Sequence, residues 1–223
     1  MWIKVCGMTT AEAVQAALDA QVDAIGFVFA ESKRRVTPQQ AAELARPARG
    51  RVPCIAVTKH PDQHDVDEIL AVFKPDMFQT DWEDLQSLRL PRELALLPVL
   101  RSGRGEPAAL PARVLFEGPI SGTGVPTDWP SARAMARRTQ LVLAGGLSPA
   151  NVAAAISEVQ PFGVDVSSGV ESSPGIKSPE RIVSFVNAAR SAVHAAQAAP
   201  VPAAASASSR TQSAPPRAKE KLS

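Results

Sequence analysis

The sequence predicts an α/β protein, a closed barrel of eight β/α units, because short apolar runs alternate with helix-like segments that begin with capping residues. The apolar runs cover residues 2–5, 24–29, 53–57, 76–80, 95–100, 114–118, 141–146 and 163–168. A repeated order of strand, turn and capped helix is typical of parallel strands joined by right-handed crossovers. Eight such units favour the (β/α)8, or TIM, barrel over an open flavodoxin-type sheet, which needs fewer strands.

Helix start signals support the segments between the strands. Thr9 to Glu12 and Thr37 to Gln40 both fit a capping box, and Pro38 occupies the first helical position of the second. Ser148-Pro149 and Ser178-Pro179 predict two further helix starts. Residues 101–113 are rich in proline and glycine, so we expect a loop in place of the fifth helix.

The chain divides into a barrel domain, residues 1–194, and a tail, residues 195–223. The tail consists largely of Ala, Pro and Ser with a basic end, and it lacks the bulky apolar side chains that offset ordering entropy. We therefore expect it to be disordered. About 190 residues remain, which is near the lower size limit for a barrel.

Charge and composition exclude several classes of protein. The net charge of +2 gives no reason to expect nucleic acid or an anionic membrane as a partner, and no apolar run is long enough to span a bilayer. Cys6 and Cys54 are too few for a disulfide framework, which indicates a reducing cytoplasm. Their strands would hold them too far apart for a disulfide.

Glycine-bearing loops follow the last two strands, where barrels of this type commonly bind phosphate. Gly145 and Gly146 precede the helix start at Ser148, and Ser168 and Gly169 follow the eighth strand. Glycine allows the backbone to approach an anion, and a helix N-terminus offers unpaired N–H groups. These residues predict a site for a small phosphorylated substrate, although glycines that serve only tight turns are the alternative.

Cys6 ends the first strand and is the first candidate for proton transfer. Lys4 and Cys6 face the same way on a strand, so an inward face would place both in the barrel mouth. A nearby ammonium and a helix start both favour the thiolate, which suits a base or a nucleophile. An inert, small core residue is the alternative for Cys6, and it is the better interpretation of Cys54.

Glu117 ends the sixth strand and is the candidate acid. A carboxyl group opposite a thiol makes an acid–base pair that can move a proton between neighbouring carbons. The carboxyl must be protonated, which burial against apolar walls would favour. Asp128 is the alternative acid, but capping the next helix explains it without catalysis. Gly122 to Gly124 predict a mobile loop that closes over a ligand.

Arg34 and the histidines are the remaining candidates for ligand contacts. Arg34 is a candidate for holding a substrate carboxylate through two N–H bonds, although a solvated loop arginine is the alternative. His60, His64 and His194 lack a spacing with Cys or acidic residues that indicates a metal, so we expect no metal site.

Five segments together resemble the phosphoribosylanthranilate isomerase family of tryptophan biosynthesis. They are KVCGMT at 4–9, GFVF…SKRRV at 26–36, SGTG…DW at 121–129, LAGGLSPANV at 143–152 and VDVSSGVESSPGIK at 164–177. The match is in order and spans residues 1 to about 190. The pairing of an N-terminal K-x-C-G-x-T motif with VDVSSGVE is specific to that family.

The resemblance implies a cofactor-free Amadori rearrangement of N-(5-phosphoribosyl)anthranilate to 1-(2-carboxyphenylamino)-1-deoxyribulose 5-phosphate. It makes Cys6 the general base that takes the proton from ribose C2, and Glu117 the general acid that protonates the furanose ring oxygen. It also implies that Arg34 holds the anthranilate carboxylate and that Asp165 lies near the sugar hydroxyls. Gly145, Gly146, Ser168 and Gly169 match the family's phosphate loops. A monomer or a homodimer is expected.

Three departures from the family's pattern bear on the site. Glutamate replaces the usual aspartate at 117, QLHG after strand four reads Gln79-Thr80-Asp81-Trp82, and FVN after strand three reads Val57-Thr58-Lys59. A changed substrate is therefore one alternative. The others are a different phosphosugar barrel, such as an epimerase or an aldolase, and a non-catalytic ligand-binding barrel that would not need Cys6 and Glu117.

Overall fold

The computed structural model describes residues 1–119 and 127–198 of the 223-residue chain. The predicted mobile segment Gly122 to Gly124 lies outside the described residues, and so does the predicted tail from residue 199 onward.

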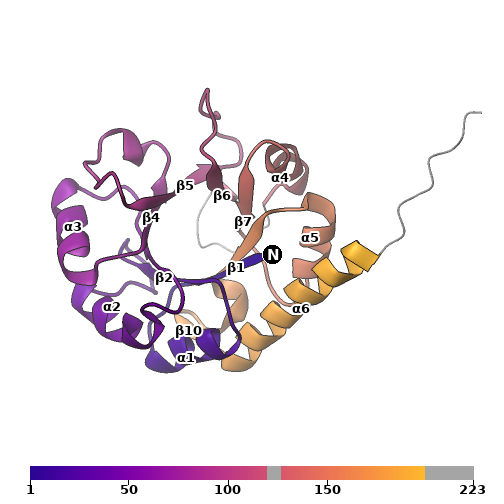
Figure 1. The fold of residues 1–223 in the computed structure, drawn as a ribbon, viewed down its shortest axis with the longest axis horizontal. Coiled ribbons are helices and arrows are strands. Elements are labelled where there is room, and N and C mark those ends of the chain that lie inside the picture. The colour runs from indigo at the N-terminus through magenta and orange to yellow at the C-terminus, as the bar shows by residue number, and fades with distance from the viewer. Residues whose placement is uncertain (120–126, 199–223) are drawn as a thin grey trace, which may run out of the picture.

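Eight parallel strands form a closed barrel in chain order, which confirms the predicted fold (Figure 1). β1 pairs with β2 on one side and with β8 on the other, so the ring closes where β1 and β8 pair, beginning with Trp2 opposite Gly163. The strands are β1 (Trp2–Cys6), β2 (Ala24–Val28), β3 (Cys54–Val57), β4 (Met77–Asp81), β5 (Ala95–Arg101), β6 (Arg113–Glu117), β7 (Gln140–Leu143) and β8 (Gly163–Val166).

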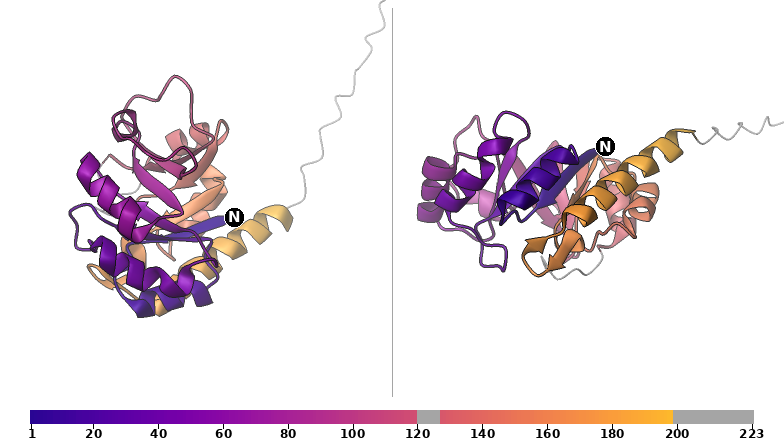
Figure 2. Two further views of the ribbon diagram at one scale, coloured as in Figure 1. Left: turned by 60° about the vertical axis from the view of Figure 1, so that its left-hand side comes forward. Right: turned by 90° about the horizontal axis from the view of Figure 1, so that it is seen from below.

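Helices cover the outside of the barrel. They are α1 (Ala11–Asp19), α2 (Pro38–Ala45), α3 (Gln63–Glu68), α4 (Trp129–Ala136), α5 (Val152–Val159) and α6 (Pro179–Ala198), with the short helical segments η1 (Arg46–Ala48), η2 (Ile69–Phe73), η3 (Asp84–Gln86) and η4 (Ser168–Val170). α6 runs along the outside of the barrel in both views of Figure 2 and packs against α1 and α5. None of the helices in the described part of the chain is long and apolar enough to cross a membrane.

The connections differ from one another. The fifth connection, residues 102–112, contains no helix in the described chain, as predicted. The fourth connection has only the 3-10 turn η3, which the sequence did not indicate. α6 continues to Ala198, so the helical backbone extends four residues past the predicted domain boundary at 194.

Two of the predicted helix starts are confirmed, one is displaced by one residue, and one is wrong. Thr37 and Gln40 form the capping box, and the Ser178 hydroxyl accepts from the Arg181 amide. The first box is displaced, because Thr10 caps α1 by accepting from the Ala13 amide. The other error is at Ser148, because α5 begins only at Val152 and the Asn151 side chain accepts from the Ser148 amide at 2.8 Å.

The core has two layers. The interior of the barrel is filled by a small apolar cluster, which includes Ile55, Leu97 and Leu115. A larger cluster lies between the strands and the surrounding helices, where Phe27 and Phe78 are fully buried. Both layers leave the carboxyl ends of the strands to polar side chains, which is where barrels of this kind place their chemistry.

A two-stranded hairpin of β9 (Glu171–Ser173) and β10 (Ile176–Lys177) follows β8 and folds against the loops after β1 and β2. Thr9 donates a hydrogen bond to the Gly175 carbonyl at 2.7 Å. A Cβ on Gly175 would lie 2.6 Å from the Lys33 carbonyl oxygen, and the residue has a φ of +89°. Only glycine fits there, so the hairpin tip is seated on both loops.

Candidate active site

Cys6 lies at the carboxyl end of β1 beside a buried ion pair. Lys4 Nζ is 2.9 Å from Asp165 Oδ1, and the Lys4 side chain has no exposure to solvent. The Lys4 ammonium also interacts with the Cys6 sulfur. The predicted inward placement of Lys4 and Cys6 therefore agrees with the structure, and Asp165 joins them from the neighbouring strand β8.

The charge environment of Cys6 differs from the prediction. Burial raises the pKa of the Cys6 thiol, the Lys4 ammonium lowers it, and the Asp165 carboxylate raises it again, so that the pKa lies above its ordinary value. The Lys4 ammonium does favour the thiolate, as expected, but burial and the Asp165 carboxylate outweigh its effect on the pKa. The sequence-based expectation did not include desolvation or the counter-charge of Asp165.

Two glycines make room for the side chains around Cys6. A Cβ on Gly26 of β2 would lie 3.0 Å from the Cys6 sulfur and 3.1 Å from Lys4 Cε. A Cβ on Gly7, which has a φ of +83°, would lie 2.7 Å from Arg34 Cδ. Since each contact is closer than a normal carbon contact allows, glycine at both positions keeps Cys6 and Arg34 where they are.

Arg34 is fixed by a partner that the sequence did not suggest. Its Nε and Nη2 donate to the two oxygens of Glu171 at 2.6 and 2.9 Å, and Lys177 Nζ donates to the same carboxylate at 2.8 Å. The edge of the guanidinium with Nε and Nη2 is thus occupied by Glu171, whereas Nη1 is not part of this pair. Glu171 and Lys177 both belong to the motif at 164–177, and that was the only available signal for them.

The two predicted phosphate loops are packed against each other. Gly145 and Gly146 both have positive φ, +89° and +66°. A Cβ on Gly169 would overlap the Leu147 carbonyl of the β7 loop, and Ser168 begins the 3-10 turn η4. The structure therefore brings all four predicted residues to one side of the barrel mouth. The cap of α5 is at Asn151 rather than Ser148, so the amides nearest the glycines belong to a turn and not to a helix.

Glu117, the last residue of β6, is ion-paired rather than surrounded by apolar walls. Its Oε1 accepts from Arg101 Nη1 at 2.6 Å. Arg101 is the last residue of β5 and also holds Asp81, the last residue of β4, through Nη2 at 2.5 Å and Nε at 3.2 Å. The expected apolar environment of the acid is therefore wrong. Asp128 is exposed at the N-cap of α4, where its carboxylate accepts from the Ser131 hydroxyl.

His60 extends this network to the outside. Its Nδ1 lies 2.9 Å from Asp84 Oδ1, and its Nε2 lies 3.8 Å from Asp81 Oδ2. One ligand atom from each of these three side chains falls within 4.8 Å of the others, a proximity that linear spacing did not indicate. Asp81 is held by Arg101, and Asp84 accepts from the Thr80 hydroxyl at 2.7 Å, so the cluster has the contacts of an ion-pair network.

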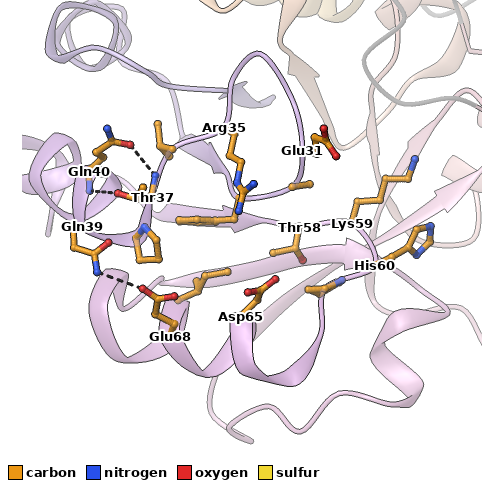
Figure 3. Close-up of a pocket in the computed structure, with 16 residues that line it drawn as sticks. Glu31, Arg35, Thr37, Gln39, Gln40, Thr58, Lys59, His60, Asp65 and Glu68 are labelled. Carbon is orange, nitrogen blue, oxygen red and sulfur yellow. Dashed lines mark hydrogen bonds between the residues drawn. The ribbon is translucent and has the colours of Figure 1, made fainter.

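A cavity of about 500 Å³ opens beside His60, between the loops after β2 and β3 (Figure 3). Charged side chains including Arg35, Lys59 and Glu68 surround it. Its lining, taken over the described residues, includes neither Cys6 nor Glu117. We therefore place the candidate active site at the barrel mouth and not in this cavity.

Gln79 is a further candidate contact. It is buried on β4, and its Oε1 accepts no hydrogen bond from the described residues. A buried acceptor without a donor is costly, so a ligand hydroxyl would find a ready partner there.

Comparison with known proteins gives a consistent result. The family model described as N-(5′-phosphoribosyl)anthranilate (PRA) isomerase matches residues 3–188. An N-(5′-phosphoribosyl)anthranilate isomerase of Azorhizobium caulinodans is 36% identical over 214 residues, covering 85% of this chain and 92% of that protein. Among solved structures, TrpF from Jonesia denitrificans is 32% identical with a TM-score of 0.74, covering 86% of this chain and 98% of the other.

A second solved structure carries a ligand. It is a phosphoribosyl anthranilate isomerase in complex with reduced 1-(o-carboxyphenylamino)-1-deoxyribulose 5-phosphate. It is 25% identical with a TM-score of 0.68, and the match covers 86% of this chain and 99% of that one.

Proposed function

This chain belongs to the N-(5′-phosphoribosyl)anthranilate isomerase family, and we propose that it performs the family's rearrangement with Cys6 as general base and Glu117 as general acid. The reaction converts the aldose N-(5′-phosphoribosyl)anthranilate into the ketose 1-(2-carboxyphenylamino)-1-deoxyribulose 5-phosphate, a step of tryptophan biosynthesis. The placement of a buried thiol, a fixed arginine and two packed glycine loops around one barrel mouth supports this proposal.

The first step opens the ribose ring. Glu117 donates its proton to the ring oxygen, the bond between that oxygen and C1 breaks, and the anilino nitrogen supplies the electron pair that forms a C1–N double bond. Glu117 is left as a carboxylate, which the neighbouring Arg101 stabilises. An acid in this position must hold a proton before the step and be stable as an anion after it.

The second step moves a proton away from C2. The Cys6 thiolate takes the C2 proton, and the electron pair left behind forms a C1–C2 double bond while the nitrogen becomes neutral. The resulting enolamine then tautomerises to the ketose, with loss of the C2 hydroxyl proton and gain of a proton at C1. The cationic nitrogen formed on ring opening adds positive charge near the sulfur, and this offsets the burial and the Asp165 charge that favour the thiol.

The two anionic ends of the substrate would be held on different sides of the mouth. Gly145, Gly146, Ser168 and Gly169 would receive the phosphate through backbone amides and a hydroxyl, as glycine-bearing loops do in this fold. Arg34 would hold the anthranilate carboxylate on the side of Nη1, while Glu171 fixes the edge with Nε and Nη2. Asp165 would remain near the sugar hydroxyls.

Replacement of Cys6 by alanine tests the base. Cys6→Ala should retain substrate binding and lose roughly 10²- to 10⁴-fold in kcat, the usual contribution of one positioned proton-transfer group. Cys54→Ala is the matched control, because Cys54 is also a buried strand cysteine but lies in the core outside the site. Turnover of Cys6→Ala within a few-fold of the wild type would remove the thiol from the mechanism.

A pair of carboxyl substitutions tests the acid. Glu117→Gln should abolish turnover, whereas Asp128→Asn should cost about 1 kcal/mol of stability or less, because Asp128 is an exposed helix-cap residue. An active Glu117→Gln together with an inactive but folded Asp128→Asn would reverse the assignment. A non-catalytic ligand-binding barrel would turn over no substrate in any of these forms.

We further propose that the chain works in the cytoplasm. Cys6 must stay reduced to act as a base, and both cysteines of the described structure are free.

A further inference from the structure

Arg101 connects three strand ends of the barrel into one ion-pair network. Its guanidinium lies between Asp81 of β4 and Glu117 of β6, and the Arg101 side chain is 4% exposed. Asp81 is 1% exposed and Glu117 is 15% exposed. The network therefore runs from a buried carboxylate, through a buried cation, to a carboxyl group at the edge of the barrel mouth.

The two carboxyl groups contact the guanidinium differently. Asp81 receives two N–H donors, from Nε and Nη2, while Glu117 receives Nη1 at 2.6 Å. The guanidinium is planar and its donors are fixed relative to one another. The two bonds to Asp81 therefore set the direction of the bond to Glu117.

We propose that Arg101 is a positioning residue for Glu117, and that Asp81 is the counter-charge that keeps Arg101 from holding Glu117 as a permanent carboxylate. This proposal rests on the role of Glu117 as general acid. A guanidinium paired with a single carboxylate strongly favours its charged form, which cannot donate a proton. Sharing the same cation with the buried Asp81 weakens that effect while the hydrogen bond still fixes the carboxyl group.

The departures from the family's pattern meet in this network. The glutamate at 117 carries one more methylene than the usual aspartate, and Asp81 stands in the segment where QLHG is usual. The added reach at 117 makes the carboxyl more mobile, and a bond to a fixed guanidinium restricts it. His60 follows the altered segment after strand three and lines the cavity in Figure 3. Its Nε2 lies 3.8 Å from Asp81 Oδ2.

Among the described residues, the charged side chains other than Arg101 on the elements beside Glu117 are exposed; Arg104 in the loop after β5 lies 3.9 Å from Glu83, and Glu106 pairs with Arg138. Strand β7 carries no titratable side chain, and neither does the segment 118–127 by its sequence. Arg133 of α4 is exposed to solvent. Behind Asp81, the network continues to His60 and Asp84. Arg101 is thus a buried cation in direct contact with Glu117.

Asp81→Asn is the direct test, with the pH dependence of kcat as the measurement. The asparagine keeps an acceptor for Arg101 but removes the counter-charge, so Arg101 should hold the Glu117 carboxylate more strongly. The alkaline limb of the kcat profile, where the acid loses its proton, should move down by about one pH unit, while KM stays nearly constant. An unmoved limb, or a limb that moves up, would overturn the proposal.

The double variant Asp81→Asn with Arg101→Gln is the second test, and it avoids leaving a buried charge unpaired. It removes the guanidinium that contacts Glu117, so its alkaline limb should lie above that of the wild type as well as above that of Asp81→Asn. A limb at or below the wild-type position would contradict the role of Arg101.

Glu83→Gln is the matched control for both variants. It removes one negative charge two residues from Asp81, but its side chain is 55% exposed, so the limb should stay in place. A failure of this inference is distinguishable from a failure of the proposed function. A Glu117→Gln variant that remains active would reject the acid itself, whereas an inactive Glu117→Gln beside an unshifted Asp81→Asn would reject only the network.

Discussion

Gly26→Ala should separate the position of the Cys6 sulfur from its chemistry, because the new methyl group would press on it. The added Cβ would lie 3.0 Å from the sulfur and 3.1 Å from Lys4 Cε, and ordinary contact begins at 3.4 Å. The sulfur must therefore move by about 0.4 Å. Since a misplacement of 1 Å can cost roughly 10²-fold, a proportional effect gives about a sixfold loss in kcat.

The stability of this variant should fall only modestly, because two opposing effects act on it. Overpacking costs about 1–3 kcal/mol, and replacing glycine by alanine in a compatible conformation returns about 0.4–1 kcal/mol. Melting temperature and steady-state kinetics on N-(5′-phosphoribosyl)anthranilate measure the two effects. Gly105→Ala is the control, because nothing lies within 4 Å of its Cβ position. If Gly26→Ala kept wild-type kcat, the sulfur would not need its observed position, and the mechanism above would lose its geometric basis.

The remaining predictions concern the loops, the thiols and the acid stability of the site. Burial alone would raise the pKa of Glu171, but hydrogen bonds from Arg34 and Lys177 lower it below its ordinary value. This stabilisation is present above the ordinary glutamate range and is lost as the pH falls below it, so urea denaturation from pH 6 to pH 3 should show a smaller loss for Glu171→Gln than for the wild type. Burial raises the pKa of Cys54 to about 11 and that of Cys6 above its ordinary value, so iodoacetamide should label both slowly at neutral pH and faster only in strongly alkaline buffer; fast labelling of the native protein at pH 7 would contradict this. Gly169→Ala should raise KM by a larger factor than it lowers kcat, because its methyl group would push the two phosphate loops apart. The inhibition constant of inorganic phosphate, used as a competitive inhibitor, measures the weakened phosphate binding independently. Truncation after Ala198 should leave the melting temperature unchanged, and a large drop would show that the barrel needs the segment removed.

The barrel was predictable because its signals are local. Each strand is a short apolar run and most helices carry a cap within a few residues, as at Thr37 and Ser178. The start of α5 was predicted at Ser148, although Asn151 is also a residue type that commonly caps helices. Ser148-Pro149 gives the stronger pattern, and only the folded turn reveals that the Asn151 side chain binds the Ser148 amide.

The strand-end positions of Cys6 and Glu117 were predictable, but the charges around them were not. Cys6, Arg34 and Glu117 were identified from their strand-end positions and from the family motifs. Their partners come from other strands: Asp165 is 161 residues from Lys4, Glu171 is 137 from Arg34, and Arg101 is 16 from Glu117. Linear patterns carry no information about such pairs. The sequence therefore did not predict the Asp165 charge beside Cys6, nor the ion pair that replaces the expected apolar surroundings of Glu117.

The pairing of β1 with β8 also determines when the site can exist. The strand that carries Cys6 is synthesised first, and its neighbour with Asp165 emerges 161 residues after Lys4. At a synthesis rate of about 5–20 residues per second, the N-terminal strand waits on the order of 8–32 s for that partner. Closure of the ring and formation of the Lys4–Asp165 pair are one event. A nascent chain stalled before β8 therefore contains Cys6 but lacks the ion pair beside it.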